Sequence, residues 1–164
     1  MTSSVTIRSA MQSDDDSIWR MIESVFRAGE TYPVPRDISR TDAFTYWRAS
    51  GHEVFVAEDD GQIVGTYYLR SNNRDGDSHI ANCGYIVATD ACGRGVGRAM
   101  CADSLERARK RGFTAMQFNF VISSNERAIS LWQSCGFAII GTLPGAFAHP
   151  TRGLVDAYVM YRKL

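Results

Sequence analysis

A glycine-rich stretch at residues 91–98 has the spacing in this sequence that best fits a chemical role. Gly93, Gly95 and Gly97 alternate with arginine and valine, and they follow an apolar run that ends at Val87. Glycine allows backbone conformations that a side chain forbids, so the N–H groups of such a turn approach an anion closely. A helix that begins there adds the partial positive charge of its N-terminus. The stretch therefore predicts a turn that binds a pyrophosphate.

The spacing of these glycines narrows the class of ligand. A dinucleotide fingerprint requires G-x-G-x-x-G with an acidic residue about 20 positions later. Here the pattern is G-x-G-x-G, and the region around Ala115 is apolar. A nucleoside-triphosphate loop requires Gly-Lys followed by Ser or Thr, and the sequence contains no such tripeptide. Both ligand classes are excluded, and an ordinary glycine-rich connection remains the alternative.

The composition fits one globular domain. The sequence has 164 residues, of which 45% are hydrophobic and 22% charged, and this is enough to bury a sizeable core. Its 18 basic residues balance 18 acidic ones, so no overall field attracts nucleic acid or a membrane surface. The sequence has no recognisable secretion signal, no C-x-x-C pair and no histidines at ligand spacing. We therefore expect a cytoplasmic protein without a metal.

Hydrophobic periodicity predicts the elements that position the turn. A capping box of Ser13 and Asp16 is expected to open the first helix. Strand, helix and strand around the turn predict a parallel pair of strands. The expected elements are a strand over 5–8, a helix ending near Gly29, a helix over 41–49, a hairpin of 54–57 and 63–69, a strand over 79–87, a helix over 95–111, a strand over 115–121, a helix from 125 to 136, and strands over 137–140 and 155–161 separated by a loop over 144–153.

Two motifs in register resemble the GNAT family of N-acetyltransferases. Residues 92–97 resemble its acetyl-CoA pattern Gln/Arg-x-x-Gly-x-Gly/Ala, with Cys92 at the first position. Residues 125–137 match Asn-x-x-Ala-x-x-Leu-Tyr-x-x-x-Gly-Phe, with Trp132 in place of tyrosine. The resemblance covers nearly the whole chain. It implies an α/β (α+β) fold: a single domain over 1–164 with a mixed, mostly antiparallel sheet, a central parallel pair and helices on both faces.

The resemblance also implies acetyl-CoA as co-substrate and an N-acetyltransferase activity. In the family, the strand before the turn separates from its neighbour, and its free backbone groups bind the pantetheine arm. Asn125 matches a family asparagine that hydrogen-bonds the co-substrate, although asparagine is also a good helix N-cap. The co-substrate contacts that the resemblance implies are Tyr85, Ile86, Val87, Gly93, Arg94, Gly95, Val96, Gly97, Arg98 and Asn125.

Trp132 changes the expected chemistry. Many relatives have at this position a tyrosine that protonates the departing thiolate, whereas an indole N–H does not release its proton at useful pH. We therefore expect a mechanism that positioning dominates. Water or a carboxylate, Glu30 or Asp156, is expected to deprotonate the amine.

Two asparagines are candidates for substrate binding. Asn82 and Asn119 each lie within a predicted strand between apolar neighbours, where asparagine is disfavoured. Residues 79–84, 118–121 and 153–157 show a looser resemblance to the Mpr-type acetyltransferases of azetidine-2-carboxylate and related proline analogues. This resemblance implies that the two amides bind a substrate carboxylate, and we expect Asn119 and Asn125 to take part in catalysis. Alternatively, the two amides satisfy each other or nearby backbone.

Three functions follow from these observations. The leading interpretation is acetylation of a small-molecule amine, namely an amino or imino acid or a toxic analogue. The alternatives are acetylation of a protein N-terminus or lysine, which the same fold supports, and a non-catalytic acyl-CoA sensor. We expect a small-molecule partner and neither nucleic acid nor membrane, with a homodimer left open as the assembly.

Overall fold

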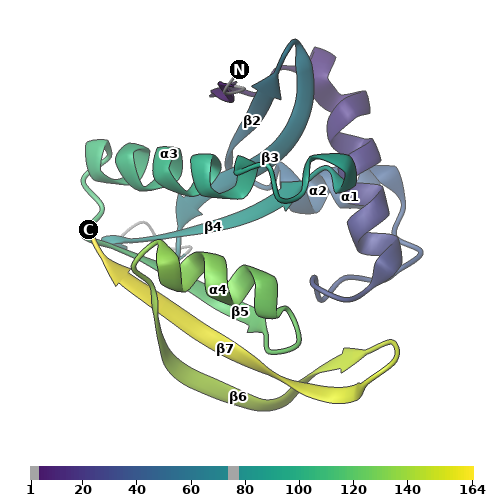
Figure 1. Cartoon of the computed structure of the whole chain (residues 1–164), viewed down its shortest axis with the longest axis vertical. Helices are drawn as coiled ribbons and strands as arrows, with labels where there is room; N and C mark the ends of the chain where they lie inside the picture. Colours follow the sequence, from purple (N-terminus) through teal and green to yellow (C-terminus); the bar gives the residue numbers. More distant parts are fainter. Residues whose placement is uncertain (1–3, 74–77) are drawn as a thin grey trace.

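Seven strands form one mixed sheet in residues 4–73 and 78–164, the residues that the computed structural model describes. Their order across the sheet is β1-β2-β3-β4-β5-β7-β6, and β4 and β5 are the parallel neighbours (Figure 1). The strands are β1 (Thr6–Ser9), β2 (Glu53–Asp59), β3 (Gln62–Ser71), β4 (Ile80–Val87), β5 (Ala115–Ile122), β6 (Ala138–His149) and β7 (Gly153–Lys163).

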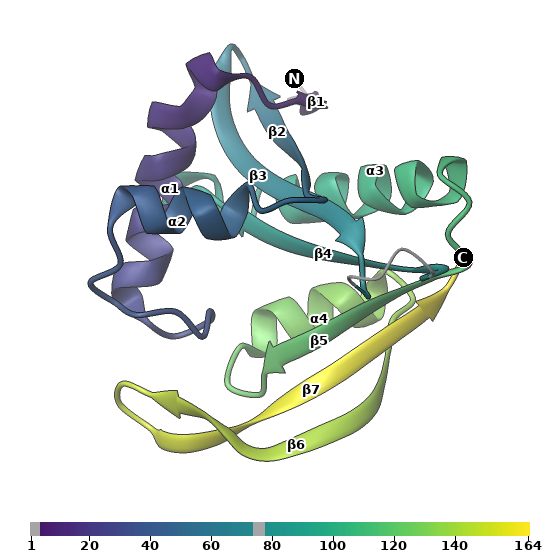
Figure 2. The same cartoon turned by 180° about the vertical axis from the view of Figure 1, so that it is seen from behind.

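Helices cover both faces of this sheet. In Figure 1, α3 (Val96–Lys110) and α4 (Glu126–Ser134) lie in front of the strands, and Figure 2 shows α1 (Asp15–Ala28) and α2 (Arg40–Trp47) on the opposite face. Two separate apolar clusters fill the space beneath the two helix pairs. Among the described residues, no helix combines the length and the apolarity needed to cross a membrane. The predicted fold class and order of elements are confirmed.

The start of α1 differs from the prediction. The structure does not use Ser13 and Asp16 as a capping box, because a short 3-10 turn over Gln12–Asp14 precedes the helix. The Asp14 carboxylate instead accepts a hydrogen bond of 2.7 Å from the Met11 N–H, and it also pairs with Arg8. Met11 and Asp14 thus form a capping box around the 3-10 turn, two residues earlier than the predicted Ser13 and Asp16.

The closing strands are longer than predicted. The expected loop over 144–153 is wrong, because β6 continues through Pro144 and only a tight turn separates it from β7. Proline is tolerated there because β6 is an edge strand, where a missing N–H costs no ladder hydrogen bond. A register shift between Leu143 and Phe147 accommodates the extra length, and the Asp156 carboxylate accepts the Gly145 N–H at 2.9 Å within it.

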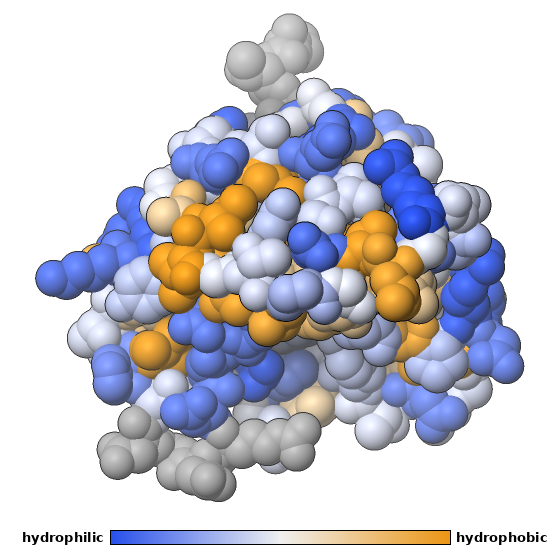
Figure 3. Space-filling view, turned by 90° about the horizontal axis from the view of Figure 1, so that it is seen from below, coloured by the Kyte–Doolittle hydropathy of each residue, from blue (hydrophilic) through white to orange (hydrophobic). Residues whose placement is uncertain are grey.

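Apolar side chains are exposed on these two strands. Figure 3 shows apolar patches between polar side chains on the face seen from below. Ile139, Ile140 and Leu143 of β6 and Leu154 of β7 are exposed large apolar residues. The homodimer stays a prediction.

The parallel pair separates soon after it begins. Within the described part of the chain, β4 and β5 pair at Ile80 with Ala115 and at Ala81 with Met116, and at no later position. Beyond these residues the two ribbons diverge (Figure 1). The edge of β4 from Asn82 to Val87 therefore has no partner strand on this side, and its backbone groups are left for another partner.

Candidate active site

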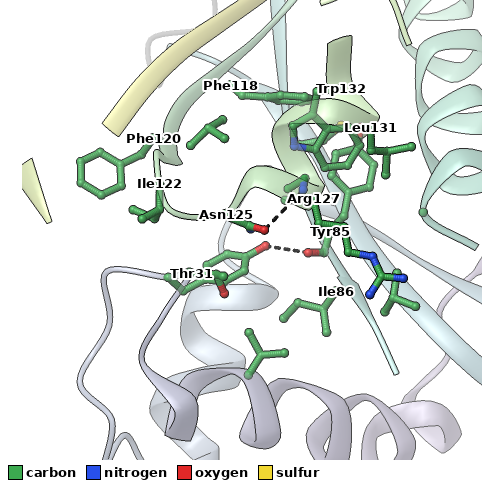
Figure 4. Close-up of a pocket in the computed structure, with 18 of the residues that line it drawn as sticks. Thr31, Tyr85, Ile86, Phe118, Phe120, Ile122, Asn125, Arg127, Leu131 and Trp132 are labelled. Atoms are coloured by element: carbon green, nitrogen blue, oxygen red, sulfur yellow. Dashed lines mark hydrogen bonds between the residues drawn. The ribbon is translucent and has the colours of Figure 1, made fainter. Parts of the chain in front are cut away.

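A cavity of about 620 Å³ lies where β4 and β5 separate. The diverging strands, the glycine turn, α4 and the segment that joins α1 to α2 all line it (Figure 4). This position gives the cavity two ends. One end reaches the glycine turn, and the other reaches polar side chains of β3, β4 and β5.

The glycine turn forms the first end. Gly95 has a φ of 82°, a left-handed conformation that favours glycine, and it is the N-cap of α3. None of the described side chains caps this helix, so the N–H groups of its first turn remain available for an anion. The predicted residues that line the cavity here are Gly93, Gly95, Val96, Gly97 and Arg98.

Arg94 is the predicted contact that the structure does not bring into the cavity. Its guanidinium instead forms an ion pair with Asp59 at the end of β2. Arg98 does line the cavity, and its guanidinium donates to Ser134 Oγ at 2.8 Å. One of the two predicted cations is therefore held away from the turn.

Arg127 supplies a cation that the sequence analysis missed. It is in the first turn of α4 and lines the cavity, and its Nη2 is 3.1 Å from where a Cβ on Gly93 would lie. Figure 4 shows its side chain within the cavity lining. A cation in the first turn opposes the helix dipole, and this unfavourable position was the available signal.

The free edge of β4 forms the wall between the two ends. Tyr85, Ile86 and Val87 all line the cavity, as predicted. The Tyr85 hydroxyl is directed towards α3, where it is 2.7 Å from Ser104 Oγ, while its carbonyl accepts a hydrogen bond of 3.0 Å from the Tyr32 hydroxyl (Figure 4). Burial raises the pKa of Tyr32 well above its ordinary value, so this hydroxyl stays protonated at neutral pH.

The second motif contributes Asn125 and Trp132. Asn125 lines the cavity and also caps α4, because its Oδ1 accepts the Ala128 N–H at 3.4 Å. Trp132 is only 9% exposed, with its ring centroid 4.8 Å from that of Tyr85 and 5.1 Å from that of Phe118. Trp132 thus belongs to the apolar core and also lines the cavity.

Asn82 and Asn119 line the other end of the cavity, where they belong to one polar network. Asn82 Nδ2 donates to the Gln117 carbonyl at 2.9 Å, and Asn119 Nδ2 donates to Asn72 Oδ1 at 2.7 Å. The Gln117 side chain closes the network by donating to Asn119 Oδ1 at 2.9 Å. The alternative interpretation is thus correct in part, because each amide has a nearby protein partner.

Three further residues of this end were missed by the sequence analysis. Tyr46 of α2 and Tyr68 and Arg70 of β3 all line the cavity. Gly84 makes room for Tyr68, since a Cβ at Gly84 would lie 2.6 Å from its ring. Burial raises the pKa of both tyrosines, so they act as neutral hydrogen-bonding groups. A charged residue at the end of an apolar strand was the one signal for Arg70.

No carboxylate, histidine or lysine of the described residues lines this cavity. Glu30 lines a smaller polar cavity of about 180 Å³ together with His149, and the two cavities share Thr31 and Asn125. Asp156 lines neither cavity, because it holds the β6 backbone at Gly145. Of the two carboxylates suggested as bases, only Glu30 is therefore near the site.

Comparisons with known proteins agree with this architecture. The model of the acetyltransferase (GNAT) family matches residues 18–137. A GCN5-related N-acetyltransferase from Kribbella flavida has a solved structure with a TM-score of 0.92 and 40% identity, covering 98% of both chains. The phosphinothricin acetyltransferase of Sinorhizobium meliloti, solved in complex with acetyl-CoA, has a TM-score of 0.86 at 22% identity and covers 100% of this chain and 89% of its own.

Curated relatives are more distant. N-acetyltransferase aca1 of Schizosaccharomyces pombe is 26% identical over 148 residues, covering 80% of this chain and 71% of the relative. The mycothiol acetyltransferase of Streptomyces avermitilis is 27% identical over 138 residues, and the chain spans only 43% of that relative's length. The family model covers most of the described fold, including the glycine turn, the separated strands and α4. The chain belongs to the GNAT family of acetyltransferases.

Proposed function

We propose that this chain, acting as one N-acetyltransferase domain over residues 1–164, transfers the acetyl group of acetyl-CoA to the amine of a small molecule. The acceptor we propose is an amino or imino acid or a toxic analogue of one. The acetyl-CoA bound to the phosphinothricin acetyltransferase of the same fold supports the co-substrate. The resemblance to the acetyltransferases of proline analogues stays a prediction.

The first end of the cavity fits the phosphates of acetyl-CoA. Uncapped N–H groups at the start of α3 and the guanidinium groups of Arg98 and Arg127 offer both partial and full positive charge. We propose that Arg127 replaces the side-chain donor that Cys92 lacks, since it reaches the turn beside Gly93. The unpaired edge of β4 is then available to the pantetheine arm.

Direct transfer needs little covalent chemistry from the protein. Acetyl-CoA supplies a thioester: the amine nitrogen forms a bond to the acetyl carbon, the carbon–sulfur bond breaks, and the proton that the amine loses neutralises the thiolate directly or through solvent. Backbone groups of Tyr85 to Val87 would polarise the acetyl carbonyl, and Asn125 would hold the co-substrate in place. Because no described carboxylate or histidine lines the cavity, positioning of a neutral amine contributes most.

The observation that supports the acceptor class is the composition of the second end of the cavity. Amide groups of Asn82 and Asn119 line it, and no acidic side chain of the described residues does. A polyamine or an extended lysine side chain carries positive charge that would find no partner here. A carboxylate next to the amine would find hydrogen-bond donors, so an amino or imino acid suits this end better.

The test is release of CoA thiol with a panel of acceptors. Each amino acid would be paired with its decarboxylated amine, and short peptides with free N-termini or lysines would be included. A buried polar group that loses its partner costs about 1 to 3 kcal/mol, which predicts a roughly 5- to 150-fold lower kcat/KM for the decarboxylated amine. Asn119→Ala acting on the amino acid is expected to show a loss in the same range.

Other outcomes would assign the site differently. Equal rates on an amino acid and its decarboxylated amine would remove the carboxylate from the proposal. A strong preference for peptides would favour a protein acetyltransferase. Binding of acetyl-CoA with no release of thiol for any acceptor would favour a sensor.

A further inference from the structure

The positive charges of the cavity lie in two separate places. Arg98 and Arg127 are beside the glycine turn, whereas Arg70 lies on β3 among the polar side chains of the other end. No carboxylate in residues 4–73 and 78–164 forms an ion pair with Arg70, although seven other arginines of this part have such pairs. The charge of Arg70 is therefore not balanced by the described part of the protein.

The sheet register places Arg70 beside Asn82. The two residues are direct cross-strand neighbours of β3 and β4, which puts their Cβ atoms about 4.5 to 5.5 Å apart. Tyr68, two positions earlier on the same face, lies over Gly84. The positive charge of Arg70 also opposes the rise in the pKa of Tyr46 and of Tyr68. The guanidinium thus belongs to the same group of side chains as the two tyrosines and Asn82.

The hydrogen bonds of Arg70 leave donors for a ligand. Nη1 donates to the carbonyls of Ser71 and Asn72 at 3.1 and 3.4 Å. A guanidinium has five N–H groups, and no hydrogen bond within the described residues uses Nε or Nη2. The amides of Asn82 and Asn119 each donate one N–H to a protein oxygen and keep the other, but they carry no charge. Arg70 therefore has both the charge and the donors that a carboxylate needs.

We propose that Arg70 binds the carboxylate of the acceptor and selects amino or imino acids over uncharged amines, while Asn82 and Asn119 position it. This inference rests on the proposed function and adds the residue that determines its specificity. The acceptor carboxylate would lie at the β3 side of the cavity, with Asn82 beside it. Its amine would then extend along β4 towards Tyr85, where the thioester is proposed to lie.

The experiment compares two acceptors in three variants. The acceptors are an amino acid and its carboxamide, which keeps the amine and removes the negative charge, and each rate is expressed relative to wild type on the same acceptor. Arg70→Gln is expected to lower kcat/KM for the amino acid roughly 10- to 150-fold, mainly through KM, since a charge-assisted hydrogen bond is lost. Its rate on the carboxamide should fall much less, because this acceptor carries no negative charge for the guanidinium to bind.

Two further variants separate charge from folding. Arg70→Lys keeps the charge without the planar fork, so it should recover part of the loss on the amino acid. Arg20→Gln is the matched control, because Arg20 is exposed on α1 and does not line the cavity. Thermal stabilisation by acetyl-CoA should be unchanged in all three variants, which shows that the fold and the first end of the cavity are intact.

The outcomes distinguish this inference from the function on which it rests. If wild type does not prefer the amino acid to its decarboxylated amine, the proposed acceptor class fails and the inference fails with it. If wild type prefers the amino acid to both the decarboxylated amine and the carboxamide, but Arg70→Gln retains the preference over the carboxamide, only the role of Arg70 is wrong. An equal loss on amino acid and carboxamide would make Arg70 a residue that shapes the cavity rather than one that binds charge.

Discussion

The two ends of the cavity are built in different ways. The end at the glycine turn comes largely from one continuous segment and presents backbone N–H groups, with Gly95 as an uncapped helix start. The second end, which is proposed to bind the acceptor, is assembled from side chains of α2, β3, β4 and β5, including Tyr46, Arg70 and Asn82. Backbone groups suffice to bind a co-substrate such as acetyl-CoA, which is proposed for the first end. Selection of one acceptor amine among many requires side chains.

The largest expected effect tests the end built from backbone. Gly95→Asp should abolish binding of acetyl-CoA, because it places a negative charge at a helix N-terminus proposed to bind phosphate. The measurement is thermal stabilisation by acetyl-CoA relative to wild type. Gly112→Asp is the matched control, since the φ of Gly112 is 84° against 82° for Gly95, and at neither site would an added Cβ lie within 4 Å of another part of the described structure. Equal stabilisation in the two variants would contradict the assignment of the turn.

A second pair of variants tests α4, which contributes to the cavity through both its cap and its body. Asn125→Ala removes a helix cap and a proposed co-substrate contact, so kcat/KM should fall by about tenfold. Trp132→Phe should retain most of the turnover, because the ring serves packing against Tyr85 and Phe118 and transfers no proton. If Trp132→Phe were the more damaging change in a folded protein, the argument about the leaving group would be wrong.

Tyr32 binds the β4 wall between the two ends, and its replacement should have a smaller effect. Tyr32→Phe loses one hydrogen bond, to the Tyr85 carbonyl, which is worth about 1 kcal/mol or roughly a fivefold fall in kcat/KM. The shape of the pH–rate profile should not change below pH 10, because the raised pKa of Tyr32 keeps its hydroxyl neutral throughout. Tyr161→Phe on β7, outside the cavity, is the control. A shifted profile would make Tyr32 a proton-transfer group.

The smallest effect on either end is expected from the Arg8–Asp14 pair, which lies outside the cavity. The hydrogen bonds from Arg8 lower the pKa of Asp14 below its ordinary value of 3.8. The pair therefore stabilises the fold above about pH 4, and this contribution is lost as the pH falls through the lowered pKa. Asp14→Asn should cost about 1 to 3 kcal/mol of unfolding free energy at pH 7 and leave both KM values unchanged.

Calorimetry at several pH values checks this prediction. The difference in stability between wild type and Asp14→Asn should shrink as the pH falls below 4, since the wild-type carboxylate then becomes protonated. A constant difference down to pH 2 would show that lost packing, and not the ion pair, causes the effect.

The difference between an end formed by backbone groups and an end formed by side chains also explains which parts of the site could be predicted from the sequence. The glycine turn was predictable because backbone recognition demands glycine at fixed spacing, and Asn125 because a cap has a fixed distance from its helix. Arg70 and Tyr46 line the same cavity because of the register of β3 and β4 and the packing of α2 on the sheet. No local sequence pattern predicts either feature. The extension of β6 was missed because most of its residues are exposed, so no buried alternation marks the strand. Pro144 also favoured a loop in the prediction, because proline disrupts a central strand, but an edge strand such as β6 tolerates it.

The short stretch of pairing between β4 and β5 also has a consequence for the expected motion of the sheet. Within the described residues, two residue pairs of the β-ladder join strands β1–β4 to strands β5–β7, so we expect the two parts of the sheet to move relative to each other more easily than strands paired along their whole length. Beyond Ala81, the amide hydrogens of β4 that face β5 have no ladder partner among the described strands. They should therefore exchange with deuterium faster than those of β3, which pairs on both sides. Acetyl-CoA bound between β4 and β5 would take the place of the missing strand pairing and hold the two parts of the sheet together. Without acetyl-CoA, we therefore expect the two parts of the sheet to open transiently between β4 and β5. Binding of acetyl-CoA should slow amide hydrogen exchange at Tyr85 to Val87.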